Sequence, residues 1–179
     1  MNKIIHIILI SIISLTVLSC SSDDSKTATS SGLFIAVGHE GVILTSSDGT
    51  TWTSRTSGSS QGMWNIFYGN STFVTVGGSG TILTSSDGTT WTSRTSGSTE
   101  GLFGITYGNG TFVVVGDNDS GSGTILTSSD GITWTSRTSG ISNSLWDVNY
   151  GNNTFVASDG AGGIITSSDG ISWTSRVGI

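Results

Sequence analysis

The feature that most constrains this chain is a sixteen-residue phrase that occurs four times. The phrase ILTSSDGTTWTSRTSG begins at Ile43 and is repeated without change from Ile82. A third copy from Ile125 differs only at Ile132, and a degraded fourth copy begins at Ile164. The aspartates of successive copies are 39, 43 and 39 residues apart. A period of about 40 residues indicates a repeat architecture, in which each unit is a small structure that packs on its neighbours.

Each full unit divides into four short segments that we expect to be strands. The first carries alternating apolar residues that we place on one face: Trp64, Ile66 and Tyr68; Phe103, Ile105 and Tyr107; Trp146, Val148 and Tyr150. The second segments resemble TFVTVG, the third TILTSS and the fourth TTWTSR. YGN separates the first two segments and SDG the last two, and both phrases favour hairpin turns.

Four short antiparallel strands per unit predict an all-β, β-propeller-like fold of about four blades, with a β-solenoid as the alternative. The chain enters at the second strand of a blade, near Leu33, so the first blade lacks one strand. Complete blades follow at 62–94, 101–137 and 144–176. The chain then either closes as a small ring or forms an open arc. An open arc would expose apolar blade faces, so self-assembly into a homo-oligomer is a further hypothesis.

The SDG phrase predicts a hydrogen-bonded turn. Its carboxylate can accept bonds from turn N–H groups, its glycine can adopt positive φ, and the tryptophan that follows can cover the hairpin. The phrase resembles the Asp-box, or BNR repeat, of sialidase-like β-propellers, although here glycine directly follows aspartate. Similar phrases occur in exported proteins that resemble photosystem II assembly factors. The resemblance extends from Gly32 to Arg176 and implies a structural role for Ser46, Asp48, Gly49, Trp52, Ser85, Asp87, Gly88, Trp91, Ser128, Asp130, Gly131, Trp134, Ser167, Asp169, Gly170 and Trp173.

The copies differ most in the loops that join second to third strands and in the connections between blades. Both sets belong to one rim of a propeller, whereas the constant YGN and SDG turns belong to the opposite rim. We interpret this variable rim as a candidate binding surface for a glycan or a protein. Its candidate ligand-binding residues are His39, Glu40, Gln61, Glu100, Asp117, Asp119, Asn143 and Asp159.

Neither a metal site nor a cofactor is predicted. Asp117 and Asp119 are spaced as at the start of a calcium loop, but the twelfth position would be Ser128 instead of a bidentate glutamate. His39 and Glu40 are adjacent, yet no further metal ligand lies near them in the sequence.

No catalytic residue is predicted either. A sialidase-type enzyme needs clustered arginines, a nucleophile pair and an acid/base carboxyl group. The four arginines Arg55, Arg94, Arg137 and Arg176 instead share one position on the outer strand of each unit. We therefore predict a non-catalytic binding module. The alternatives are an assembly or scaffold factor for an envelope complex and a degenerate glycosidase-like propeller.

The N-terminal segment predicts export. Residues 1–19 combine Lys3 with an apolar run that is too short to span a bilayer, as in a signal peptide. The phrase VLSC, which ends at Cys20, resembles the lipobox of bacterial lipoproteins and implies that Cys20 is lipidated. The alternative is a conventional signal peptide with an incidental cysteine. Residues 20–31 then form a tether, and residues 32–179 form the repeat domain.

Because Ser21 follows Cys20, the resemblance implies an outer-membrane location, lipid-anchored and facing the periplasm or the cell surface. The expected partners are this membrane, through the lipid anchor, and a glycan or protein ligand. The net charge of the chain is −6. Nucleic acid is not expected as a partner, because phosphate binding needs clustered basic residues.

Overall fold

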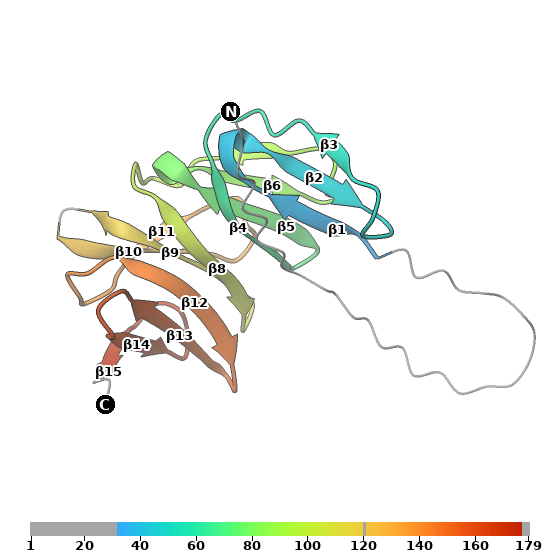
Figure 1. Cartoon of the computed structure of the whole chain (residues 1–179). Helices are drawn as coiled ribbons and strands as arrows, with labels where there is room; N and C mark the ends of the chain where they lie inside the picture. Colours follow the sequence, from blue (N-terminus) through green and yellow to red (C-terminus); the bar gives the residue numbers. More distant parts are fainter. Residues whose placement is uncertain (1–31, 120, 177–179) are drawn as a thin grey trace, which may run out of the picture.

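The structure is a computed structural model that describes residues 32–119 and 121–176 (Figure 1). The predicted signal peptide 1–19, the predicted lipidation site Cys20 and the predicted tether 20–31 lie outside these residues. In the two described ranges, no helix has the length and hydropathy needed to cross a membrane.

Fifteen strands in the described residues form four antiparallel sheets, each ordered as in the chain. The first sheet has three strands, β1 (Phe34–Val37), β2 (Ile43–Ser46) and β3 (Thr53–Arg55). The second has β4 (Met63–Gly69), β5 (Thr72–Gly77), β6 (Ile82–Ser85) and β7 (Thr92–Arg94). The third has β8 (Leu102–Gly108), β9 (Thr111–Asp119), β10 (Ser122–Ser128) and β11 (Thr135–Thr138). The fourth has β12 (Leu145–Gly151), β13 (Thr154–Asp159), β14 (Ile164–Ser167) and β15 (Thr174–Arg176).

This architecture confirms the predicted all-β, propeller-like fold and the missing strand of the first blade. Two short 3₁₀ turns, η1 (His39–Gly41) and η2 (Gly78–Gly80), join second to third strands. The YGN turns join first to second strands in a left-handed conformation. In the turn between β4 and β5, Asn70 and Ser71 have φ of 45° and 57°. Two successive positive φ angles are typical of the hairpin turns that match strand twist.

The sheets pack face to face. We call the face directed toward the next sheet in the chain the front face and the other the back face. On the fourth sheet, the front face is the one that carries the residues at the same repeat positions. Val74, Val76 and Ile82 on the front face of the second sheet pack in one buried cluster with residues of the back face of the third, such as Val114 and Leu126. Equivalent clusters join the first sheet to the second and the third to the fourth. Buried apolar contact between neighbouring sheets therefore stabilises the stack.

The stack is an open arc. The first and fourth sheets lie at opposite ends of it (Figure 1). On the front face of the fourth sheet, Val156 and Ile164 are 41% and 37% exposed. Their repeat equivalents on the third sheet, Val113 and Ile125, are fully buried. Of the two arrangements that the sequence left open, the described residues adopt the arc.

One prediction about the inner strands is wrong. Trp64 does not share a face with Ile66 and Tyr68, because a β-bulge intervenes: Met63 pairs with Gly77, while Asn65 pairs with the very next residue, Val76. Met63 and Ile66 therefore enter the same core cluster, and Trp64 is left out of it. The same bulge sets Phe103 and Trp146 apart from the residues with which the alternating pattern groups them. An extra residue in one strand reverses the facing of the residues before it.

Candidate functional site

The variable loops and the connections between sheets meet on one rim, which we call the variable rim. Gly78 N in a strand-joining loop donates a hydrogen bond to Gly62 O, 3.0 Å away in a connection between sheets. Asp117 N donates in the same way to Gly101 O, at 2.8 Å. On the opposite rim, the side chain of Asn70 in a YGN turn donates to Ser129 O in an SDG turn, at 3.2 Å. The two classes of loop therefore lie on opposite rims.

Three aromatic side chains line the inner strands at the variable rim. Trp64 and Phe103 have ring centroids 5.1 Å apart with their planes tilted by 34°. Phe103 and Trp146 are stacked, with centroids 4.7 Å apart and planes at 8°. These rings are the three bulge residues of β4, β8 and β12. We call them the aromatic ladder. It runs across three sheets, and the indole of Trp146 at its end is 55% exposed.

Glycines beneath the ladder let its rings lie against the backbone. A Cβ atom added to Gly101 would lie 2.8 Å from Cζ3 of Trp64 and 3.0 Å from Cε1 of Phe103. One added to Gly160 would lie 2.7 Å from Nε1 of Trp146. A side chain at either position would displace a ring, so the ladder depends on glycine for close approach.

The ladder was missed in the sequence, although a signal for it is present. Each ring directly follows a buried apolar side chain, Met63, Leu102 or Leu145, and the next buried apolar side chain of the strand comes three positions after that one. A spacing of three does not fit the period of two of a regular strand. The bulge can be inferred from that mismatch, but the stacking of its residues across sheets cannot.

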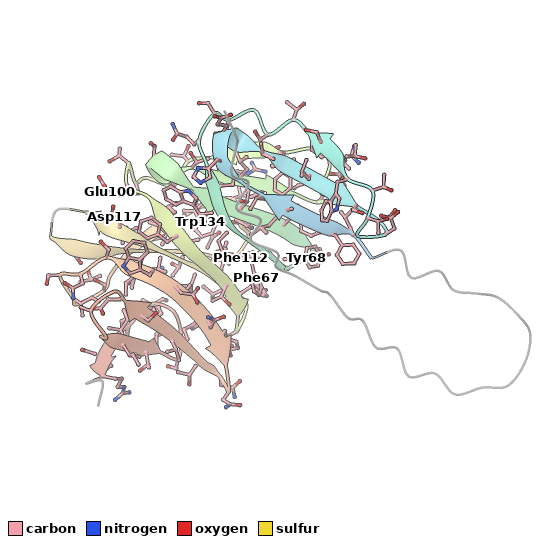
Figure 2. All side chains as sticks on the ribbon, in the orientation of Figure 1. Phe67, Tyr68, Glu100, Phe112, Asp117 and Trp134 are labelled. Carbon is pink, nitrogen blue, oxygen red and sulfur yellow. The ribbon has the colours of Figure 1, made fainter. Side chains whose placement is uncertain are left out.

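Acidic residues adjoin the ladder: Glu100 directly precedes Gly101, which lies against the rings of Trp64 and Phe103. Glu100 and Asp117 lie near each other at the loop end of the third sheet (Figure 2). The Asp117 carboxylate accepts a hydrogen bond of 2.6 Å from the Ser144 hydroxyl. Asp147, which follows Trp146 on β12, is exposed and accepts a bond of 2.9 Å from the Asn149 amide. The ladder is therefore flanked by negative charge.

Two other predicted rim residues lie beside the first ring of the aromatic ladder. A Cβ added to Gly62 would lie 3.2 Å from Nε1 of Trp64 and 3.4 Å from Nδ1 of His39, and one added to Gly78 would lie 3.6 Å from Cζ2 of Trp64 and 3.0 Å from Oε1 of Gln61. His39 and the exposed Glu40 lie in η1, beside the first sheet. Gln61 accepts a bond of 3.4 Å from the Ser79 hydroxyl at the second sheet. Asp119 ends β9, and its side chain lies outside the described part of the structure. The structure thus brings His39 and Gln61 together beside Trp64.

Asn143 and Asp159 are brought together and close a loop. The Asn143 amide donates to Oδ2 of Asp159 at 2.8 Å, and Gly163 N and Ala161 N donate to Oδ1 at 2.6 and 2.9 Å. The Asn143 amide, followed by the Gly163 N–H, lowers the pKa of Asp159 below its ordinary value. The lowered pKa keeps this carboxylate ionised, and its bonds fix the loop between β13 and β14. Among the described residues, no three His, Cys, Asp or Glu side chains form a group that could hold a metal ion.

The SDG turns form the same hydrogen-bonded clasp four times. In the third copy, Gly131 N donates to Ser128 Oγ at 2.8 Å, and this hydroxyl donates to Asp130 Oδ1 at 2.9 Å. The N–H groups of Ile132 and Thr133 donate to the same carboxylate oxygen at 2.8 and 2.9 Å. Matching bonds occur in the clasps of Asp48, Asp87 and Asp169.

Turn N–H groups lower the pKa of every clasp aspartate, and the larger effect comes from the N–H three residues after it. The tryptophan of each clasp is also engaged. Trp134 Nε1 donates to Gly131 O at 3.1 Å, and its ring packs against the core between the second and third sheets. Trp91 and Trp173 pack against the neighbouring cores in the same way. These contacts hold the hairpins together.

The arginines lie on the outer strands β3, β7, β11 and β15. Each Nε donates to a threonine hydroxyl on the adjacent strand, as Arg94 does to Thr84 at 2.8 Å. They do not cluster, because the repeat places one on each sheet.

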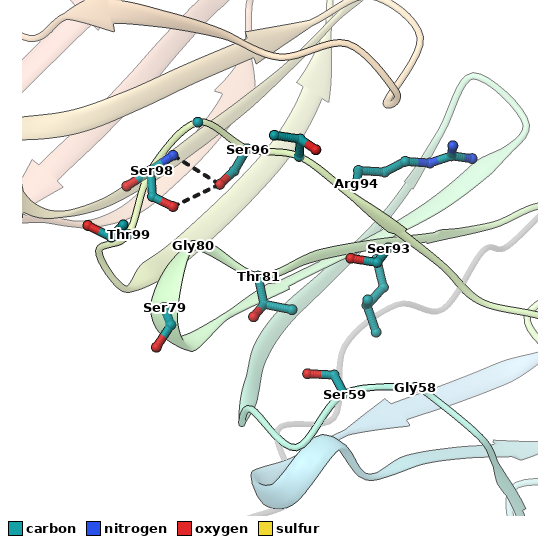
Figure 3. A pocket seen from close by; sticks show the side chains of 13 residues that line it. Gly58, Ser59, Ser79, Gly80, Thr81, Ser93, Arg94, Ser96, Ser98 and Thr99 are labelled. Carbon is teal, nitrogen blue, oxygen red and sulfur yellow. Dashed lines mark hydrogen bonds between the residues drawn. The ribbon is translucent and has the colours of Figure 1, made fainter.

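A pocket of about 440 Å³ lies between the end of the first repeat unit and the second sheet (Figure 3). Its lining includes Ser59, Ser79, Thr81 and Ser98, and the Arg94 side chain extends away from Ser98. A smaller pocket of about 120 Å³ occupies the equivalent place one unit later. We interpret both as grooves between repeat units, because they occupy equivalent places in successive units.

No protein-family model matches the chain, and no curated protein matches it. Several solved structures are similar to it in fold. YCF48 from Cyanidioschyzon merolae is 19% identical with a TM-score of 0.60, over 80% of this chain and 52% of that one. The structure titled YCF48 bound to D1 peptide is 19% identical with a TM-score of 0.62, over 82% of this chain and 50% of that one. The GH74 enzyme of Niastella koreensis is 23% identical with a TM-score of 0.54, over 79% of this chain and 22% of that one.

This chain therefore spans about half the length of the YCF48 structures. At these identities the likeness is one of fold. The repeat, the four antiparallel sheets and the similar solved structures together identify the chain as a repeat protein of the β-propeller type.

Proposed function

We propose that this chain is a non-catalytic binding module that takes a segment of a protein along the aromatic ladder of the variable rim. The observation that carries the proposal is the bulge repeated in β4, β8 and β12, which diverts one aromatic ring per sheet out of the core. A bulge redirects a side chain and disrupts the local hydrogen bonding between the two strands, and bulges recur next to functional sites. Exposed aromatic rings supported by rigid strands are the usual anchors of a binding surface.

The charge around the ladder favours a basic or neutral ligand. Glu100, Asp117 and Asp147 flank the rings, whereas the described arginines lie on the outer strands. A lysine or arginine of the ligand could pair with these carboxylates and pack over the exposed face of Trp146. A similar propeller, YCF48, has been solved bound to a peptide, and this favours a protein ligand over a glycan.

Absence of catalysis is part of the proposal. The two glutamates of the chain, Glu40 and Glu100, occupy loops of different repeat units, and the arginines are separated by the repeat. One similar structure is titled an enzyme, but at 23% identity it is similar in fold alone.

A peptide array and a glycan array, probed with the full chain, test the proposal. We expect basic peptides that contain aromatic or aliphatic residues to bind, and Trp146→Ala to weaken this binding at least tenfold. Ile132→Ala is the matched control, because Ile132 is 49% exposed but lies in an SDG turn. Binding to glycans alone, or equal loss in both variants, would contradict the proposal.

We further propose that Cys20 anchors the chain in the bacterial outer membrane, where the module would serve as a scaffold for an envelope complex. Several acyl chains, each stabilised by about 0.8 kcal/mol per buried CH₂ group, would make the anchoring permanent. Labelling with a radioactive fatty acid should mark the wild-type chain and not Cys20→Ser. Equal labelling of both, or a wild-type chain released by salt alone, would rule the anchor out.

A further inference from the structure

We propose that the front face of the fourth sheet packs on the back face of the first sheet of a second copy, so that two chains close one ring. The free front face carries Val156, Ser158 and Ile164, and the free back face carries Phe34, Ala36 and Leu44. This inference concerns the ends of the arc and does not depend on the ligand of the variable rim.

The proposed contact continues an interface that the chain already makes three times. Between the third and fourth sheets, Val113, Val115 and Ile125 pack with Phe155, Ala157 and Ile165. At the same repeat positions, the free front face has valine, serine and isoleucine, and the free back face has phenylalanine, alanine and leucine. The two free faces therefore have the same residues as an existing pair of faces at four of six positions, with leucine in place of isoleucine at the fifth and serine in place of valine at the sixth.

The side chains at these positions are less buried than their equivalents. Val156 and Ile164 are 41% and 37% exposed, whereas Val113 and Ile125 are fully buried. Leu44 on the free back face is half-buried, whereas its equivalent Leu126 is 2% exposed. Apolar faces of this kind are a recognised sign of an association surface.

Among the described residues, no other sheet packs on the clasp of the first sheet. A Cβ added to Gly131 would lie 3.3 Å from Cγ2 of Val74, and one added to Gly170 would lie 2.9 Å from Cγ2 of Val113. Each of these glycines thus packs on the front face of the preceding sheet. Gly49 has only Phe34 of its own sheet nearby, at 3.8 Å. In the proposed contact, Val156 of the second copy would take the place that Val74 and Val113 occupy.

The constant rim supplies a polar part of the same contact. The Asn70 amide donates to Ser129 O in the next sheet at 3.2 Å, and the Asn109 amide donates to Ser168 O at 3.4 Å. Asn152 is the third member of this series and is exposed on the last sheet. Its equivalent acceptor is the carbonyl of Ser47 in the first clasp, which a second copy would bring to it.

The stoichiometry of two is part of the proposal. A contact between different faces of identical chains either closes a ring or extends into a filament. Two copies supply eight sheets, within the four to eight blades usual for propellers. The chain also spans about half the length of the YCF48 structures to which its fold is similar.

Paired cysteines in the full chain test the contact with a short bismaleimide cross-linker in isolated membranes. The test pair is Ser47→Cys with Thr154→Cys. Its equivalent inside the chain is Ser129→Cys with Thr72→Cys, because Cγ2 of Thr72 lies 3.8 Å from a Cβ added to Gly131. A mismatched pair, Ser47→Cys with Thr111→Cys, is the negative control. All variants keep Cys20, and the wild-type chain controls for it.

We expect the test pair to give a product with the mass of two chains, and the internal pair to cross-link without a change in mass. The mismatched pair should remain a single chain. If the test pair stays a single chain while the internal pair reacts, the contact does not exist. A series of products larger than two chains would overturn the closed ring in favour of a filament.

A substitution on the free front face provides a second measurement. Val156→Arg places a charge on an exposed position, so the chain should fold, and we expect the cross-linked product of the test pair to fall at least tenfold. Ile132→Arg, on a side chain of similar exposure in an SDG turn, should leave the product unchanged. Equal yields in the two variants would overturn the proposed surface.

Discussion

The glycine that ends each inner strand offers a test of the packing between sheets. A Cβ added to Gly108 would lie 2.1 Å from Cγ of Tyr150 on the next sheet, and one added to Gly69 would lie 2.5 Å from Cγ of Tyr107. The third glycine of this series, Gly151, has no atom within 4 Å of the added Cβ, because no further inner strand packs on it in the described part of the chain. Since none of the three has positive φ, the alanine substitutions differ only in the ring that the new methyl group meets.

The expected effects on stability are therefore different. Gly108→Ala must displace the Tyr150 ring within a packed layer, and overpacking of this kind costs about 1–3 kcal/mol in the free energy of unfolding. Gly151→Ala meets no atoms and reduces the freedom of the unfolded chain, so it should stabilise by about 0.4–1 kcal/mol. At roughly 2–4 °C per kcal/mol for a domain of this size, the two variants should differ in Tm by at least about 3 °C.

Urea and thermal unfolding of the full chain in mild detergent, followed by tryptophan fluorescence, measure these differences. A double variant adds a control for the mechanism, because Gly108→Ala should cost little when Tyr150→Ala has already removed the ring. If Gly151→Ala destabilised the protein as much as Gly108→Ala did, the cost would belong to the strand itself. The proposed stacking of rings on glycine would then be refuted.

Two further predictions concern the clasp. Ser128→Ala should lower the free energy of unfolding by about 1–3 kcal/mol, because it leaves the buried Gly131 N–H without its acceptor. Ser129→Ala, on the exposed neighbour, should change the stability little, and urea unfolding distinguishes the two variants. The clasp carboxylates have lower pKa values folded than unfolded, so the stability they contribute is present above the ordinary pKa of 3.8 and is lost as the pH falls through their folded pKa values. The urea midpoint should fall in that acidic range, and Asp130→Asn should lower it at neutral pH and make its decline with acid shallower; a midpoint independent of pH below 4 would contradict this.

The repeat by itself determined most of the fold. YGN and SDG specify turns through residues that tolerate positive φ or bind turn N–H groups, and such chemistry is local. The apolar second and third segments, such as TFVTVG and TILTSS, predict strands covered on both faces, and β5 and β6 have this burial. The missing strand of the first unit was also predictable, because it depends on counting copies within one sequence.

The tertiary structure alone decided where the inner-strand aromatics point and how the arc ends. The bulge at Trp64 depends on the pairing of β4 with β5, and the stacking of Trp64, Phe103 and Trp146 joins residues about 40 positions apart through sheet packing. Loop sequences predicted polar candidates on the variable rim, but only the folded chain showed that Asp159 closes its own loop. Local patterns thus specified turns and strands, whereas the aromatic surface and the unpaired faces arise from contacts between units that the one-dimensional repeat does not encode.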